Sequence, residues 1–228
     1  MTAPAWFANP PRQQRTRQAA DRVLAAAEGL LARGGDEELT IQAVAAEAQV
    51  SVGGIYRLFH DKAALVRAVH DRVMARMEDE LVNALRSSEP TVSATATTLV
   101  SAVTTAMRRR APALRVFLGQ GAGDPAMRDR ALRGVRRVDA ALAEALARDR
   151  DGLAHDDPAQ AAQFLLEMVL GTTMRAVGLA GAGASGANRR WDAYVSQLDR
   201  AAQVYLTAPA PVPERVATRG ARPGRRRS

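Results

Sequence analysis

Residues 40–65 read TIQAVAAEAQVSVGGIYRLFHDKAAL, and this stretch decides the fold of the amino-terminal part of the chain. Apolar residues recur at helical spacing on both sides of a short turn at Gln49 and Val50. Thr40 and Ser51 precede the two helices and are suited to cap them, because a hydroxyl oxygen accepts from the free amide groups at a helix start. Two short helices joined by a tight turn are typical of a unit that presents its second helix to the major groove of DNA.

Almost every other segment also shows helical periodicity, and none alternates apolar and polar residues like a half-buried strand. The sequence therefore predicts an all-α protein in which three short amino-terminal helices share a small core and a larger helical domain follows. Pro90, Pro112, Pro125 and Pro158 are expected at or near helix starts, where a missing amide hydrogen is harmless. The expected helices span about residues 15–33, 41–48, 51–59, 62–87, 91–110, 113–120, 126–150, 157–179 and 189–207.

The net charge of +8 is distributed unevenly along the chain. Six arginines and one acid in residues 207–228 account for +5, which leaves +3 for residues 1–206. This Pro-, Gly- and Arg-rich tail lacks apolar periodicity and is expected to be disordered; it either attracts DNA phosphates or only keeps the protein soluble. A second basic cluster, Arg12, Arg15 and Arg17, adjoins the DNA-reading unit. We divide the chain into a flexible basic arm (1–14), a helix-turn-helix DNA-binding domain (15–62), a helical domain (63–207) and a disordered Arg-rich tail (208–228).

Residue types and motifs exclude several classes of function. The chain has no cysteine, which excludes disulfides, thiolate metal sites and cysteine nucleophiles, and its three histidines are too scattered to suggest a metal cluster. It has no GxSxG, HExxH or P-loop motif, and GQGAGDP at 119–125 lacks a preceding strand and a following lysine, so we interpret it as a helix stop. We expect neither enzymatic activity nor a cofactor. Because no apolar run reaches ~20 residues and no secretory signal pattern opens the chain, we expect a cytoplasmic location.

The candidate DNA contacts follow from the helix that Ser51 opens. Its first turn holds two glycines, which either let the backbone approach DNA closely or relieve crowding against a neighbouring helix. Tyr56 offers a hydroxyl to phosphate, and Arg57 offers a fork that fits guanine or two phosphate oxygens, unless both only form a solvated face. Lys62, the single lysine beside thirty-one arginines, could neutralise a phosphate. The candidate residues are Thr40, Gln42, Ser51, Val52, Gly53, Gly54, Tyr56, Arg57, His60, Lys62, Arg15 and Arg17.

A homodimer is expected on physical grounds. One helix-turn-helix contacts too few bases to be selective, whereas two copies related by a two-fold axis would read half-sites ~34 Å apart. The last two expected helices carry apolar stripes that could form the interface, or could instead belong to the core of one chain. The candidate interface residues are Phe164, Leu165, Met168, Val169, Thr172, Trp191, Tyr194, Val195, Leu198, Ala202 and Tyr205.

The helix-turn-helix stretch resembles the amino-terminal domain of TetR-type transcription regulators, and the resemblance covers about residues 15–70. Three positions depart from the usual pattern: Gln49 stands where glycine is common, Gly54 where a threonine or serine often contacts phosphate, and Leu58 where histidine or an aromatic residue is frequent. Gly54 therefore puts one side-chain contact in doubt. The matching positions, without a gap, are Thr40, Ile41, Val44, Ala45, Ala48, Val50, Ser51, Gly53, Ile55, Tyr56, Phe59, Lys62 and Leu65.

The resemblance implies that residues 63–207 form an effector-binding and dimerisation domain, with a four-helix bundle between two copies and a pocket for a small molecule. The partners implied are double-stranded DNA with a pseudo-palindromic operator, a second copy of the chain, and an effector that we expect to be largely apolar and to relieve repression. A sequence-independent DNA-packaging protein is the alternative, because it would explain the arginine tail. The candidate ligand-binding residues, any of which could instead be ordinary core, are Met77, Leu81, Met107, Leu114, Phe117, Leu118, Phe164 and Met168, with Arg175 as a polar anchor or a dimer-edge ion-pair partner.

Overall fold

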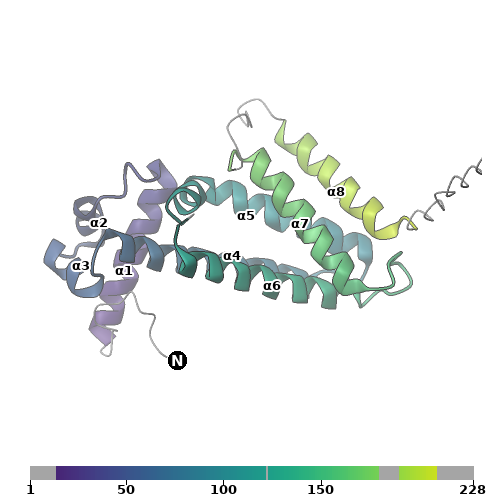
Figure 1. Cartoon of the computed structure of the whole chain (residues 1–228), viewed down its shortest axis with the longest axis horizontal. Coiled ribbons are helices and arrows are strands. Elements are labelled where there is room, and N and C mark those ends of the chain that lie inside the picture. Colours follow the sequence, from purple (N-terminus) through teal and green to yellow (C-terminus); the bar gives the residue numbers. More distant parts are fainter. Residues whose placement is uncertain (1–13, 122, 180–189, 210–228) are drawn as a thin grey trace, which may run out of the picture.

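The computed structural model describes residues 14–121, 123–179 and 190–209, which form eight α-helices. The predicted all-α fold, with a helix-turn-helix domain followed by a helical domain, is confirmed. Helices α1 to α3 form one end of the molecule, α4 runs from that end beside α6, and α7 and α8 lie side by side at the other end (Figure 1). The helices are α1 (Gln14–Gly34), α2 (Ile41–Ala48), α3 (Val52–Leu58), α4 (Lys62–Ser87), α5 (Val92–Gly121), α6 (Pro125–Leu146), α7 (Pro158–Ala176) and α8 (Trp191–Thr207).

The three amino-terminal helices pack through a small set of fully buried side chains. Five side chains of this set are completely buried in one cluster: Val23 and Leu31 of α1, Val44 of α2, Ile55 of α3, and Phe59 at the end of α3. Burial of side chains of this size stabilises the fold by about 1.5–3 kcal/mol each relative to exposure. The outward side chains of α2 and α3 are therefore free for another role, because the inward ones are sufficient to hold both helices.

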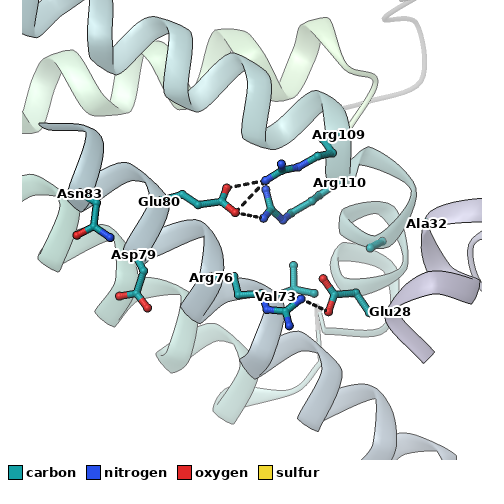
Figure 2. Close-up of a pocket in the computed structure, with 10 residues that line it drawn as sticks. Glu28, Ala32, Val73, Arg76, Asp79, Glu80, Asn83, Arg109 and Arg110 are labelled. Carbon is teal, nitrogen blue, oxygen red and sulfur yellow. Dashed lines mark hydrogen bonds and ion pairs between the residues drawn. The ribbon is translucent and has the colours of Figure 1, made fainter. Parts of the chain in front are cut away.

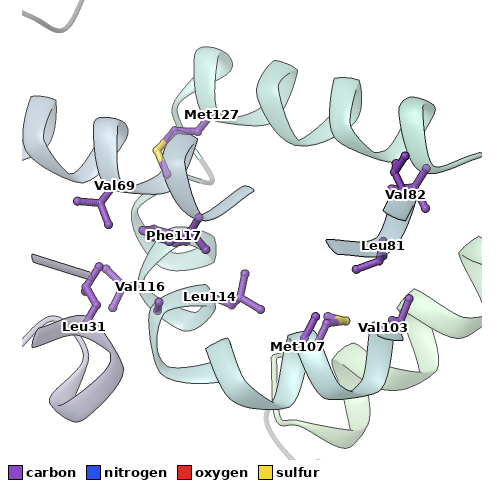
Figure 3. Packing of buried hydrophobic residues seen from close by; sticks show 14 of the residues in the cluster. Leu31, Val69, Leu81, Val82, Val103, Met107, Leu114, Val116, Phe117 and Met127 are labelled. Atoms are coloured by element: carbon purple, nitrogen blue, oxygen red, sulfur yellow. The ribbon is translucent and has the colours of Figure 1, made fainter. Parts of the chain in front are cut away.

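Helix α4 joins this small core to the rest of the protein. Asp61 caps its start by accepting a hydrogen bond from Ala64 N at 2.6 Å, and the helix then continues without interruption to Ser87. Buried residues of α1, α4, α5 and α6, including Leu31, Val69, Phe117 and Met127, belong to one continuous apolar cluster (Figure 3). Ion pairs on the surface add to the contact between α1 and α4, with Arg72 3.0 Å from Asp21 and Arg76 2.8 Å from Glu28.

Helix α5 corrects one prediction. We expected two helices, 91–110 and 113–120, with Pro112 near the start of the second, but α5 runs unbroken from Val92 to Gly121 with Pro112 inside it. A proline within a helix costs about 3 kcal/mol, because it removes one backbone hydrogen bond and crowds the preceding turn. Leu114 and Phe117 on the next turn are buried against neighbouring helices, and packing of this kind offsets such a cost. Tertiary packing therefore overrides the local signal here.

The remaining boundaries differ from expectation by a few residues at most. Pro125 and Pro158 lie in the first turns of α6 and α7 as predicted, and Asp124 and Asp157, which were not predicted, cap these helices. Helix α6 ends at Leu146 rather than near residue 150, and α7 ends at Ala176 rather than near 179. In the described part of the chain, none of the helices combines the length and apolar character required to cross a membrane.

A candidate nucleic-acid interface

Caps fix the starts of α2 and α3 and the end of α2 at the turn between them. Thr40 Oγ1 accepts from Ala43 N at 3.1 Å at the start of α2, and Ser51 Oγ accepts from Gly54 N at 3.0 Å at the start of α3. Gln49 closes α2 with a left-handed backbone, φ 53° and ψ 47°, and is the single non-glycine residue with positive φ among the described residues. The same geometry explains why glycine is common at this position in the resembling sequences, since glycine adopts it without strain.

Helix α3 presents one face to the core and the other to solvent. Ile55 and Leu58 are buried, whereas the side chains of Val52 and Tyr56 are 38% and 49% exposed. Arg57 is exposed as well. An exposed valine and tyrosine on a short helix leave apolar area in water, so this face is the natural candidate for a bound surface.

The two glycines at the start of α3 have different surroundings. A Cβ atom built on Gly53 would meet nothing within 4 Å, so the backbone there is open to a close approach from outside. A Cβ atom on Gly54 would lie 2.7 Å from Cγ1 of Val50, and Gly54 is buried. The crowding by Val50 supports the alternative explanation, relief of crowding, for Gly54, and its contact with DNA stays a prediction.

A groove of about 430 Å³ lies between the start of α1 and α3. Arg15 of α1 and Arg57 of α3 both line it, together with Thr16, Val50 and Leu58 among others. Two predicted cationic contacts are thus brought to one place by elements that are far apart in the sequence. Arg17 is exposed on the same first turns of α1. The rest of the basic arm, residues 1–13 with Arg12, and the tail 210–228 lie outside the described residues.

The remaining candidate contacts surround α3. Thr40, Gln42, Ser51 and His60 are all exposed. Lys62 Nζ lies 3.0 Å from Asp36 Oδ1 in an ion pair whose side chains are 42% and 51% exposed. Exposed pairs of this kind contribute about 0–1 kcal/mol, so the lysine can exchange its carboxylate for a phosphate at little cost.

The predicted ligand-binding residues are only partly brought together. Leu114, Phe117 and Leu118 at the end of α5 line a cavity of about 300 Å³. Met77, Leu81 and Met107 are wholly or partly buried in the general apolar cluster and do not line it. Phe164 is 51% exposed on α7 and lies against Tyr205 of α8, with 4.9 Å between ring centroids, while Met168 and the exposed Arg175 also belong to α7. The three α7 residues do not line this cavity, so their assignment to a ligand site stays a prediction.

Five further residues complete the wall of this 300 Å³ cavity and were not among our predictions. They come from α4 and from the first turns of α6, which pack against each other. The available signal was a polar residue, His70, within the apolar stripe of α4, and a basic residue beside Met127 just after a helix start. The five residues are His70, Met74, Met127, Arg128 and Ala131.

A larger and more polar cavity, of about 590 Å³, lies where α1, α4 and α5 meet (Figure 2). Arg109 and Arg110 of α5 converge on Glu80 of α4, at 2.7 and 2.6 Å, and Arg76 reaches Glu28 of α1. Burial alone would raise the pKa of Glu80, but the hydrogen bonds and charges of the two arginines lower it below the ordinary carboxyl value. Because these charges already have partners, a ligand entering here must displace ion pairs.

The stripes of α7 and α8 divide between the core and the surface. Leu165, Val169, Leu198 and Ala202 are buried within the chain, which favours the alternative that these four residues belong to the core of one chain. The other candidates are exposed or partly exposed: Phe164, Met168, Thr172, Trp191, Tyr194, Val195 and Tyr205. Trp191 also has a partner within the chain, since the guanidinium of Arg108 lies 4.9 Å from its ring centroid.

Metal binding has no support in residues 14–121, 123–179 and 190–209, where no group of three His, Cys, Asp or Glu side chains could hold an ion. The three histidines lie in different environments. His60 is exposed, His70 lines the apolar cavity, and His155 Nε2 lies 2.7 Å from the carbonyl oxygen of Tyr205.

A family model matches the amino-terminal part of the chain, and solved structures match most of its length. Residues 23–69 match the model of the bacterial regulatory proteins of the tetR family, and no curated protein sequence matches the chain. A protein from Mesorhizobium loti described as a TetR-family transcriptional regulator superposes with a TM-score of 0.69 at 16% identity, covering 85% of this chain and 97% of its own. Reduced NemR from E. coli gives 0.63 at 20% identity, covering 84% and 100%. The fatty acid degradation regulator FadR from Bacillus halodurans gives 0.59 at 16%, covering 80% and 97%.

Proposed function

The chain is a TetR-family DNA-binding transcriptional regulator, and we propose that it represses transcription as a homodimer that a small, largely apolar ligand releases from its operator. The observation that carries the proposal is the exposed face of α3, where Tyr56 and Arg57 point outward while Ile55 and Phe59 anchor the helix. A helix that is anchored by buried residues and exposes Tyr56 and Arg57 suits the major groove, which is wide enough to admit it.

We assign roles to the contacts by their chemistry. Arg57 is the candidate for base readout, because its guanidinium can bond two acceptors of guanine at once. Tyr56 and Lys62 are candidates for phosphate, and Gly53 allows the backbone of α3 to approach the strand closely. Further contacts are proposed from the exposed residues around them: Thr40, Gln42, Ser51, Val52, His60, Arg15 and Arg17.

The homodimer is proposed to form through the outer surfaces of α7 and α8. Phe164 and Val204 are 51% and 55% exposed on this side, and the ring of Tyr205 lies between α7 and α8 next to Phe164. Two copies of these helices would give a four-helix bundle in which apolar area leaves water. The dimer would place two α3 helices for the two halves of a pseudo-palindromic operator in the cytoplasm, where DNA is available.

Release by a ligand requires a difference in affinity between two states. A ligand can free the operator only if it binds the DNA-incompetent arrangement of the two α3 helices better than the competent one. The 300 Å³ cavity is the candidate site, because α4, which lines it, also begins directly beside the DNA-reading unit. Movement of α4 would therefore be transmitted to α3.

The test is selection of bound genomic fragments by the full chain, followed by affinity measurements on the selected operator and on random duplexes across a salt series. A regulator should bind the operator at least about a thousandfold more tightly than it binds random duplexes. Equal affinity for all sequences at every salt concentration would reject the proposal and favour the alternative, sequence-independent packaging. Arg57→Ala should reduce this preference, whereas Arg86→Ala, which changes an exposed arginine at the far end of α4, should not.

A further inference from the structure

The small cavity between α4, the end of α5 and the start of α6 has a wall that is mostly apolar with two polar side chains. Apolar side chains form most of it, among them Met74, Phe117 and Met127. Only two lining side chains can form strong polar contacts, His70 and Arg128. Pockets of this composition bind molecules with an apolar body, and the few polar groups fix the orientation.

His70 contributes a neutral, buried imidazole. Its side chain is 5% exposed and meets the ring of Phe117 edge-on, with 5.1 Å between centroids and an interplanar angle of 89°. Burial lowers the pKa of His70 to about 4, so near neutral pH the ring has one N–H donor and one acceptor nitrogen. In the described part of the chain its ring makes no hydrogen bond, so this capacity is available to a molecule in the cavity.

Arg128 contributes a positive charge at the exposed side of the cavity. Neighbouring arginines are engaged: Arg67 lies 3.4 Å from Asp124, and Arg130 lies 2.9 Å from Asp71. Arg128 has no such carboxylate among the described residues and is exposed. A guanidinium that is not already paired is suited to a carboxylate, which it can bind with two parallel hydrogen bonds.

We propose that this cavity binds a small apolar carboxylic acid, with its hydrocarbon part against Phe117 and Met127 and its carboxylate held by Arg128 and by the N–H of His70. The proposal rests on the proposed function, because it identifies the chemical class of the effector. A volume of about 300 Å³ corresponds to about ten water molecules and so to a ligand of on the order of ten non-hydrogen atoms.

The same position explains how binding would reach the DNA-reading unit. The pairs Arg67–Asp124 and Asp71–Arg130 tie α4 to the start of α6 on either side of His70. Neither pair lines the cavity, but a ligand that moved α6 away from α4 would lengthen both pairs. Since α4 begins at Lys62, beside α3, a shift of its first turns changes the placement of the reading helix.

The experiment measures binding to the full-length protein by calorimetry with 4-phenylbutyrate, 4-phenylbutan-1-ol and 4-phenylbutylamine, and separately measures release of the selected operator. These probes share one apolar body and differ in the charge of the end group. The acid should bind at least about tenfold more tightly than the alcohol and the amine, which corresponds to one charge-assisted hydrogen bond. Octanoate should bind as well, because the wall is apolar rather than specifically aromatic.

Variants of two arginines on α6 locate the site. Arg128→Gln should weaken binding of the acid by about tenfold or more without affecting binding of the alcohol. Arg133 is exposed and does not line the cavity, so Arg133→Gln should leave the binding of both probes unchanged. Ala131→Leu should weaken binding of all probes, because the larger side chain occupies part of the cavity. Equal binding of acid and alcohol, or no effect of Arg128→Gln, overturns the proposal. Binding of the acid without release of DNA would instead count against the proposed function alone.

Discussion

Replacement of His70 by glutamine should remove a specific part of the acid sensitivity of the fold. The pKa of His70 is lowered from 6.5 to about 4, mainly because the ring is buried; Arg130 adds to the lowering, while Asp71 and Asp124 oppose it. Between these two values the unfolded chain binds a proton on this ring that the folded chain does not, so the stability of the wild type falls as the pH falls. One pKa unit corresponds to about 1.4 kcal/mol, so about 2 kcal/mol should be lost from about pH 7 to pH 5.

The assay is urea unfolding of wild type and His70→Gln at several pH values and one fixed protein concentration, because dimerisation would make the apparent stability depend on concentration. Other titrating groups contribute equally to both proteins, so the difference in free energy of unfolding isolates His70. The variant should lose about 2 kcal/mol less than the wild type over this range. His60→Gln, which changes an exposed histidine, should follow the wild type. Parallel curves for wild type and His70→Gln would refute the assignment of a buried, neutral ring.

Three further predictions concern the DNA-reading unit. Gln49→Gly should raise the free energy of unfolding by about 0.5–1 kcal/mol, since glycine adopts the left-handed backbone at φ 53° without strain, and a loss of stability in urea would contradict this. Gly54→Ala should destabilise the fold by about 1–3 kcal/mol, because its new Cβ atom would crowd Val50. Gly53→Ala should fold at least as well as the wild type but bind the operator more weakly. Calorimetric melting measures the first effect and fluorescence anisotropy the second, and the reverse pattern would disprove the different roles given to these glycines. Ser51→Ala should cost about 1 kcal/mol by removing the cap of α3, as measured by chemical denaturation, and an unchanged midpoint would mean that the hydroxyl does not stabilise the helix.

Local signals made the reading unit predictable from sequence. Thr40 and Ser51 cap the helices that they precede, and the apolar spacing around Ile55 correctly identifies the buried face of α3. These features depend on residues within one or two turns of each other, so the sequence alone contains the information. The identification of the family depended on the same stretch, which the family model also covers.

Features that depend on contacts between distant segments were predicted less well. Pro112 seemed to mark a helix start, because the packing of Leu114 and Phe117 that keeps α5 continuous cannot be read from the local pattern. The lining of the cavity was predicted only in part for the same reason, because a stripe of Leu, Met and Phe looks alike whether it lines a pocket or fills a core. His70 and Arg128 become neighbours only when α4 and α6 pack together.

The continuity of α4 has a practical consequence for building hybrid regulators. A junction placed after residue 62, where the small domain ends in sequence, would separate Val66, Val69 and Val73 from a core that also includes Leu31 of α1. A grafted DNA-binding domain would then expose its apolar contact surface with α4. It would also lose the ion pairs of Asp21 with Arg72 and of Glu28 with Arg76. Chimaeras should therefore carry α4 through Arg76, about its first four turns, with the DNA-binding domain and change parent sequence farther along the helix.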